Sequence, residues 1–186
     1  MTLTKEIQQT ICKAEIQKGN LVAENLTYFF TGELDVASVN KSGYVSEFEV
    51  KVSRSDFKAD AKKRKWQYYE YCLQHPLTTR ARVSNYFTYV CPASDKPIIT
   101  ENELAPYMGL IYVEDDGILT IIRKPKLIHK YKHDIVKLIT KMLTVNNWKA
   151  YFGAQRLTIL NREAKAAYDQ RAIEKLNESF THLPRI

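Results

Sequence analysis

The chain has 186 residues, 45% of them hydrophobic, which is enough to bury one sizeable core. No stretch approaches the roughly 18 consecutive apolar residues of a membrane-spanning helix, so we expect a cytosolic protein with no membrane partner. The three cysteines are odd in number and form no CxxC pair, which indicates neither a disulfide framework nor a zinc ribbon.

The formal charge of +7 is unevenly distributed along the chain. Residues 1–122 carry 14 basic and 16 acidic side chains, net −2, whereas residues 123–186 carry 14 and 5, net +9. A basic block of this kind is typical of proteins that bind a polyanion, although a solvated helix can look similar. Charge alone leaves nucleic-acid binding open.

The first half of the chain predicts two helices with strands between them. Apolar residues at helical spacing predict a helix over 2–18. A second helix is expected over 56–73, because Ser55 is a good N-cap and Asp56 suits the positive end of the helix dipole. Aromatic and β-branched runs predict three strands in the intervening segment: 26–30, 33–39 and 44–52.

The second half predicts further strands and then helices. The expected strands are 85–91, 108–113 and 118–123. Beyond Pro125 the hydrophobic period changes to 3.6, which predicts a helix with its apolar face over 131–142 and another helix over 156–180. This order favours an α/β fold with a central mixed β-sheet flanked by helices. We expect residues 1–126 to form the core and 127–186 a basic helical extension packed on or adjoining it.

The hairpin of the second and third predicted strands carries the clearest chemical pattern. A three-residue turn at 41–43 would pair residues whose numbers sum to 84, setting Asp35 opposite Glu49 and Glu33 opposite Lys51. A two- or four-residue turn would shift these pairs. Because side chains alternate along a strand, five charged residues share one face of the hairpin: Glu33, Asp35, Glu47, Glu49 and Lys51.

Directly opposed carboxylates are destabilising, and a divalent cation such as Mg²⁺ would offset Asp35 against Glu49. Lys51, two residues from Glu49 on the same face, could position or deprotonate an attacking water and stabilise charge on a scissile phosphate. The alternative is a solvated hairpin face, on which Glu33 and Lys51 form a surface ion pair that contributes at most ~1 kcal/mol.

A longer pattern around these residues resembles a known family. Asp35, thirteen residues and then Glu49-Val50-Lys51 look like the D…ExK signature of the PD-(D/E)XK nuclease superfamily. The segments FEVKVSRSDFKAD…KWQYYEYC and GLIYVEDDGILTIIRKP, with a hydrophobic strand between them that ends in Cys91-Pro92, closely resemble the MmcB-type DNA-repair proteins and related phage and bacterial proteins, over roughly residues 20–126.

The resemblance implies a restriction-endonuclease-like fold and a Mg²⁺- or Mn²⁺-dependent deoxyribonuclease that works in DNA repair, recombination or phage DNA processing, in the cytoplasm of a bacterial or phage-infected cell. It further implies that Asp35 and Glu49 bind the metal with the carbonyl of Val50, and that Lys51 is the catalytic lysine. In some members an acid of the first helix joins the site, and here the candidates are Glu6, Glu15 and Glu24. The tracts KKRKW and HPLTTRARVSN look like insertions relative to many members.

Basic residues after the hairpin predict a DNA-binding surface, because phosphate contacts supply most non-specific affinity for DNA. Lys58, Lys62 and Lys65 fall at i, i+4 and i+7 of the expected helix. The full set of DNA-binding candidates is Arg54, Lys58, Lys62, Lys63, Arg64 and Lys65, and the accessory candidates are Glu33, Glu47, Ser53 and Gln67. Tyr71 forms a QxxxY spacing with Gln67, but we expect Tyr71 to pack in the core.

Two other interpretations remain open. One is a DNA-binding accessory factor that keeps the fold and cleaves nothing, and the other is a structural protein that neither binds metal nor retards DNA. His129 and His133 have the i, i+4 spacing of zinc helices, but without HExxH or a third ligand we expect no metal role. Double-strand cleavage would favour a homodimer, and the DNA structure that is cut cannot be read from the sequence.

Overall fold

The computed structural model describes residues 2–27, 32–78 and 81–144, all within one compact unit, Met1–Asn147. Its helices are α1 (Leu3–Gln17), α2 (Arg54–Asp60), α3 (Lys65–Gln74), the 3-10 helix η1 (Glu101–Glu103) and α4 (Ile135–Thr144). Its strands are β1 (Leu21–Leu26), β2 (Leu34–Val39), β3 (Val45–Val50), β4 (Tyr86–Pro92), β5 (Gly109–Val113) and β6 (Leu119–Arg123).

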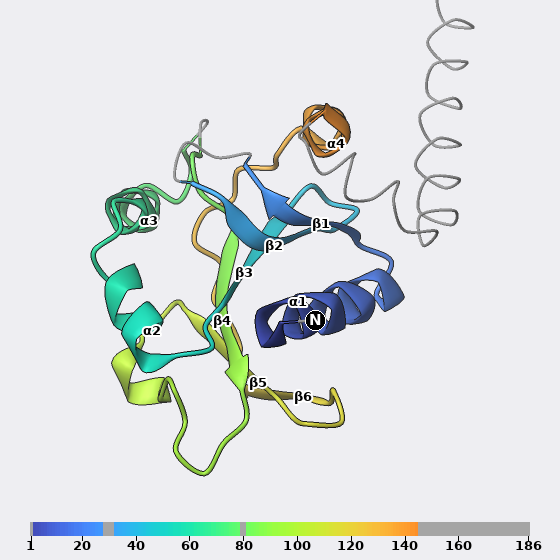
Figure 1. The fold of residues 1–186 in the computed structure, drawn as a ribbon. Helices are drawn as coiled ribbons and strands as arrows, with labels where there is room; N and C mark the ends of the chain where they lie inside the picture. Colours follow the sequence, from blue (N-terminus) through green and yellow to red (C-terminus); the bar gives the residue numbers. More distant parts are fainter. Residues whose placement is uncertain (1, 28–31, 79–80, 145–186) are drawn as a thin grey trace, which may run out of the picture. The chain divides into compact units, whose positions relative to one another are not determined.

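The strands form one sheet in the order β1-β2-β3-β4-β5-β6. β3–β4 and β4–β5 are parallel and the other neighbours antiparallel, so the predicted α/β fold with a mixed sheet is confirmed. Figure 1 shows α1 on one side of the sheet and α2 with α3 on the other. No helix among the described residues is both long and apolar enough to cross a membrane.

The β2–β3 hairpin has the predicted register. Val36 lies opposite Phe48 and Val39 opposite Val45, so paired residue numbers sum to 84. Gly43 has a φ of +81°, in the left-handed region that glycine adopts without strain. The turn therefore fixes which side chains of β2 and β3 share a face.

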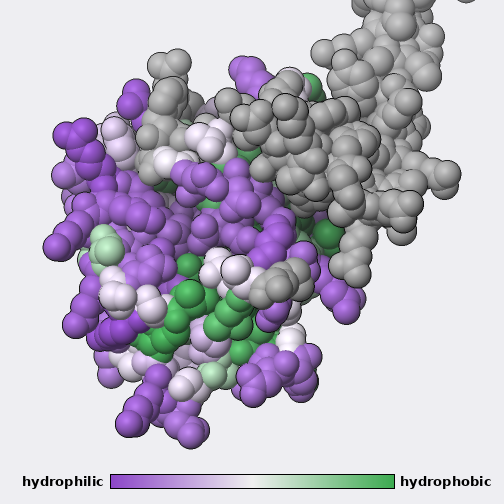
Figure 2. All heavy atoms as spheres, in the orientation of Figure 1, coloured by the Kyte–Doolittle hydropathy of each residue, from purple (hydrophilic) through white to green (hydrophobic). Residues whose placement is uncertain are grey.

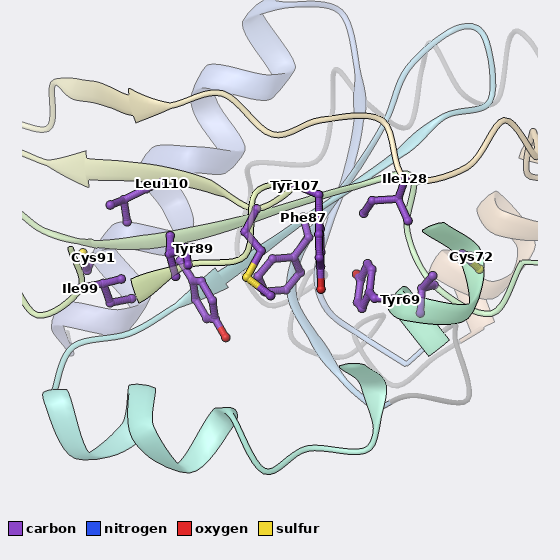
Figure 3. Close-up of a cluster of buried hydrophobic side chains, with 12 residues drawn as sticks. Tyr69, Cys72, Phe87, Tyr89, Cys91, Ile99, Tyr107, Leu110 and Ile128 are labelled. Carbon is purple, nitrogen blue, oxygen red and sulfur yellow. The ribbon is translucent and has the colours of Figure 1, made fainter. Parts of the chain in front are cut away.

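Each face of the sheet has its own apolar core. Under α1, Ile7 and Ile11 pack on Val36, Val50 and Val90. The opposite face is more aromatic (Figure 3). Its buried cluster includes Tyr69 and Cys72 of α3, Phe87 and Tyr89 of β4, and Leu110 of β5.

Several local expectations are wrong. The single helix expected over 56–73 is two helices, because α2 ends at Asp60 and α3 begins at Lys65. Ser53, rather than Ser55, is the N-cap of α2, and its hydroxyl accepts a hydrogen bond from the Asp56 backbone N–H. Tyr71 is 51% exposed instead of packed in the core. The first described strand is Leu21–Leu26, and residues 28–30 of the strand expected over 26–30 lie outside the described residues.

The break between α2 and α3 changes which side chains face the sheet. In a continuous helix, residues five positions apart point roughly 140° away from each other. Asp60 and Lys65 therefore could not both lie against β3 on an unbroken helix, whereas here both are buried there. The same break removes the predicted i, i+4, i+7 stripe, since Lys65 now belongs to the buried side of α3 with Tyr69 and Cys72.

The chain after β6 packs back on the sheet. Asn85, just before β4, accepts a hydrogen bond from the Val45 N–H and donates to the carbonyls of His129 and Tyr131. His129 lies outside any helix, is fully buried and bonds to the Val83 carbonyl. The helix expected to carry 131–142 begins at Ile135, and the helix expected over 156–180 lies outside the described residues.

Candidate functional site

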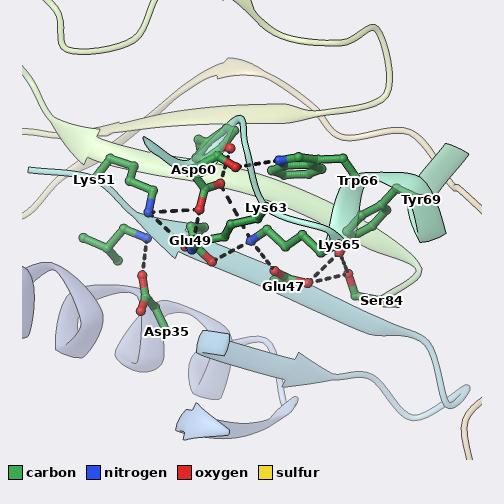
Figure 4. A network of polar contacts seen from close by, with 12 residues as sticks. Asp35, Glu47, Glu49, Lys51, Asp60, Lys63, Lys65, Trp66, Tyr69 and Ser84 are labelled. Carbon is green, nitrogen blue, oxygen red and sulfur yellow. Dashed lines mark hydrogen bonds and ion pairs between the residues drawn. The ribbon is translucent and has the colours of Figure 1, made fainter. Parts of the chain in front are cut away.

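The charged face of the β2–β3 hairpin is covered by α2 and α3 rather than solvated. Glu47 is 1% exposed, and Glu49 and Lys51 are 3% exposed each. For these three residues the interpretation as an ordinary solvated hairpin face is wrong. Figure 4 shows that they join a network of polar contacts at the end of β3, facing the two helices.

Glu49 accepts hydrogen bonds from three lysines. Its Oε1 atom lies 2.9 Å from the Nζ atoms of both Lys51 and Lys63, and its Oε2 atom lies 2.9 Å from Lys65 Nζ. Burial alone would raise the pKa of Glu49, but the charges of Lys65 and Lys51 outweigh burial and lower the pKa to about 2. Glu49 is therefore a carboxylate at neutral pH.

Asp60, at the C-terminal end of α2, is a further buried member of the network. Its Oδ2 atom accepts a hydrogen bond of 2.5 Å from the Tyr89 hydroxyl. Its Oδ1 atom forms ion pairs with Lys63 and, at 3.4 Å, with Lys51. Sequence reasoning missed Asp60. Its sequence signal was an acid followed at i+3 by Lys63, a few residues after the Glu49-Val50-Lys51 pattern.

Lys65 closes the network on the side of Glu47. Its Nζ atom lies 3.2 Å from Glu47 Oε1 and 4.9 Å from the ring centroids of both Trp66 and Phe87. The other Glu47 oxygen, Oε2, accepts a hydrogen bond of 2.5 Å from the Tyr69 hydroxyl. These contacts satisfy both carboxylate oxygens of Glu47 within the described network.

Asp35 stands at the edge of the network and is half-buried. Its Oδ2 atom accepts a hydrogen bond of 2.8 Å from the Val50 backbone N–H, and the hairpin register extends to place Asp35 opposite Glu49. Burial, and next the negative charge of Glu49, raise the pKa of Asp35 to about 6. This repulsion between two carboxylates is what a bound cation would relieve.

Lys51 is held in its charged form. Burial lowers the pKa of Lys51, but Glu49 and Asp60 raise it by more, and the net shift is upward. An ammonium group with a raised pKa can stabilise negative charge on a phosphate or orient water, but it cannot accept a proton at neutral pH. The electrostatic role is therefore favoured over the role of general base.

The structure brings only part of the predicted set together. Asp35, Glu47, Glu49, Val50, Lys51, Lys63 and Lys65 meet at the end of β3. Glu33, Lys58, Lys62, Arg64 and Gln67 have exposed side chains and are not part of the network that Figure 4 draws. Ser53 caps α2, and Arg54 binds Glu103 through its Nη1 and Nη2 atoms and donates from Nη1 to the Ile98 carbonyl at 2.7 Å.

The first-helix acids serve other contacts. Glu15 is buried and accepts hydrogen bonds from Ser38 at 2.6 Å and Asn20 at 2.8 Å. Glu24, which lies in β1, pairs with Lys5, and Glu6 is exposed. Neither Glu15 nor Glu24 contacts Asp35 or Glu49 through these bonds.

The donor types at the site fit a hard divalent cation, because Mg²⁺ commonly takes one or two carboxylates and completes its shell with water and phosphate. Asp35 and Glu49 supply two such groups. However, no cluster of three or more His, Cys, Asp or Glu side chains in the described segments is arranged to hold a metal. Both oxygens of Glu49 also accept hydrogen bonds from ammonium groups, so a cation would share this carboxylate with the three lysines or displace one of them.

Comparison with known proteins leaves the family open. No protein-family model and no curated protein matches the chain. Among solved structures, the chain is similar to the SPO1766 protein of unknown function from Silicibacter pomeroyi, with a TM-score of 0.53 and 19% sequence identity. The match covers 87% of this chain and 92% of that one, and at this identity it shows a shared fold and nothing about activity.

Proposed function

We propose that this chain is a Mg²⁺- or Mn²⁺-dependent deoxyribonuclease related to the PD-(D/E)XK superfamily. We place it in DNA repair, recombination or phage DNA processing, in the cytoplasm of a bacterial or phage-infected cell. The observation that carries the proposal is the grouping of half-buried Asp35 with buried Glu49 and Lys51 at the end of β3. A solvated hairpin would not bury Glu49 and Lys51 opposite a half-buried carboxylate.

In this proposal Asp35, Glu49 and the carbonyl of Val50 hold the cation, which would polarise a phosphate oxygen. Lys51 keeps its proton and stabilises the negative charge that develops on the phosphate. A water oxygen forms a new bond to phosphorus, the bond from phosphorus to the 3′ oxygen breaks, and a proton passes to that oxygen. The products are a 5′-phosphate and a 3′-hydroxyl.

Exposed basic residues near the site supply a surface for the DNA backbone. Lys58 on α2 and Lys62 and Arg64 in the link before α3 are exposed, and Figure 2 shows a largely hydrophilic surface over α3. These three residues keep their proposed DNA-binding role. Arg54 would first have to leave Glu103, and Lys65 is excluded from DNA contact by its burial.

The test is cleavage of supercoiled plasmid and of single-stranded circles in Mg²⁺, Mn²⁺ or EDTA. Asp35→Asn is the informative variant, because asparagine can still accept the Val50 hydrogen bond while losing the charge. Lys96→Met, an exposed residue remote in sequence from the motif, is the matched control for Lys51→Met. Metal-dependent nicking that both site variants lose and the control keeps would support the proposal. Linear product from a protein of dimeric mass would support a homodimer.

The alternative function is a DNA-binding accessory factor that does not cleave. It is favoured by one observation, the three ammonium groups on Glu49, which satisfy that carboxylate without metal. Retarded DNA migration with no cleavage of plasmid, single-stranded or branched DNA in either metal would make this the better account.

A further inference from the structure

The three lysines on Glu49 differ sharply in their access to solvent. The side chains of Lys51 and Lys65 are 4% exposed, whereas that of Lys63 is 46% exposed. Lys63 also lies outside regular structure, in the four-residue link between α2 and α3. Of the three, Lys63 is the ammonium group that can leave the carboxylate by rotating its own side chain into water.

The position that Lys63 fills is that of a cation between two carboxylates. Its Nζ atom contacts both Glu49 Oε1 and Asp60 Oδ1 (Figure 4). Because Glu49 and Asp60 are almost fully buried, each needs a positive charge nearby. The ammonium group of Lys63 meets part of that need from within the chain.

We propose that Lys63 is an internal counter-ion that competes with the divalent cation for Glu49, so that metal binds only as the Lys63 side chain swings out to solvent. This inference rests on the proposed function. The network tolerates the exchange, because Lys51 and Lys65 stay on Glu49 and the Tyr89 hydroxyl stays on Asp60. An incoming cation replaces the charge that leaves.

The exchange would also link metal binding to DNA binding. A displaced Lys63 ammonium lies next to exposed Lys62 and Arg64, where it adds one more positive charge to the proposed DNA surface. Phosphate contacts by lysine raise affinity for any DNA sequence. The metal-bound protein should therefore hold DNA more tightly than the metal-free protein.

The experiment is calorimetric titration of Mn²⁺ into the full chain as wild type, Lys63→Met and Lys62→Met. Methionine keeps the alkyl stem and removes the charge, and circular dichroism confirms folding of each variant. Lys62→Met makes the same change of net charge one residue away, at an exposed side chain outside the network. Removing a competing charge near the cation should tighten Mn²⁺ binding on the order of tenfold in Lys63→Met only.

The outcomes separate the two proposals. Equal affinity for wild type and Lys63→Met would overturn the counter-ion role and leave the nuclease proposal in place. Equal tightening in Lys62→Met would also overturn it, because the effect would then be one of net charge. If no variant binds Mn²⁺, the counter-ion role fails together with the metal-dependent nuclease.

Discussion

Replacement of Lys65 by methionine tests whether the polar network holds the fold together. The Lys65 ammonium group is buried against Glu47 at 3.2 Å and Glu49 at 2.9 Å, and the side chains of those acids are 1% and 4% exposed. Removing one partner of a buried ion pair leaves an uncompensated charge and typically costs about 3–5 kcal/mol. Lys65→Met should therefore lower the free energy of unfolding by that amount, whereas Lys62→Met should change it by less than about 0.5 kcal/mol.

Urea unfolding followed by circular dichroism at pH 7 measures this difference. The double variant Lys65→Met/Glu47→Gln removes both partners, so it should be more stable than the sum of the single variants by at least about 0.5 kcal/mol. A cost below about 1 kcal/mol for Lys65→Met would refute the reasoning. It would mean that water or a shift of the helices solvates Glu47 and Glu49 when the lysine is gone.

Three further predictions concern parts of the fold outside this network. Burial, and next the charge of nearby His129, lower the pKa of His133 from 6.5 to about 4. The folding stability that neutral His133 contributes above pH 6.5 is therefore lost as the pH falls toward 4. Between pH 7 and pH 5, His133 should lower the free energy of unfolding measured in urea by about 2 kcal/mol. The His133→Gln variant should lack this part of the pH dependence. Gly109→Ala should lower the thermal midpoint, because a Cβ atom there would lie 2.8 Å from Pro125 Cδ; a cost of about 1–3 kcal/mol is expected. Ser53→Ala should lower the free energy of unfolding by about 1 kcal/mol because α2 loses its N-cap, and Ser55→Ala should lower it much less. A larger loss in Ser55→Ala than in Ser53→Ala would identify Ser55 as the cap.

The hairpin was predictable because its determinants are local. A glycine turn and strict alternation of charged and apolar residues fix the register, and with it the approach of Asp35 to Glu49. The D…ExK pattern of Asp35, Glu49 and Lys51 was likewise visible in the sequence. Its assignment to a nuclease remains a prediction, since the structural comparison shows only a fold.

The surroundings of the motif were not predictable from local pattern. Burial of Glu47 and Glu49 depends on the crossover from β3 to β4, which places α2 and α3 over the charged face. The break after Asp60 carries no glycine or proline to signal it, and periodicity across it gave a false basic stripe. Lys65 lies four and seven residues before Tyr69 and Cys72, a spacing that could have identified it as buried.

Asn85 has a consequence for how the protein could change through recombination. The Asn85 side chain bonds both to the start of β3 and to the carbonyls of residues 129 and 131. Leu138 of α4 packs with the core of β1 and β2. A gene exchange at residue 126 would separate Asn85 from its carbonyl partners and uncover that core. A chimaera that takes its C-terminal part from another chain should fold only if the junction lies beyond residue 138. The sheet and the start of the basic segment 123–186 should therefore be inherited together.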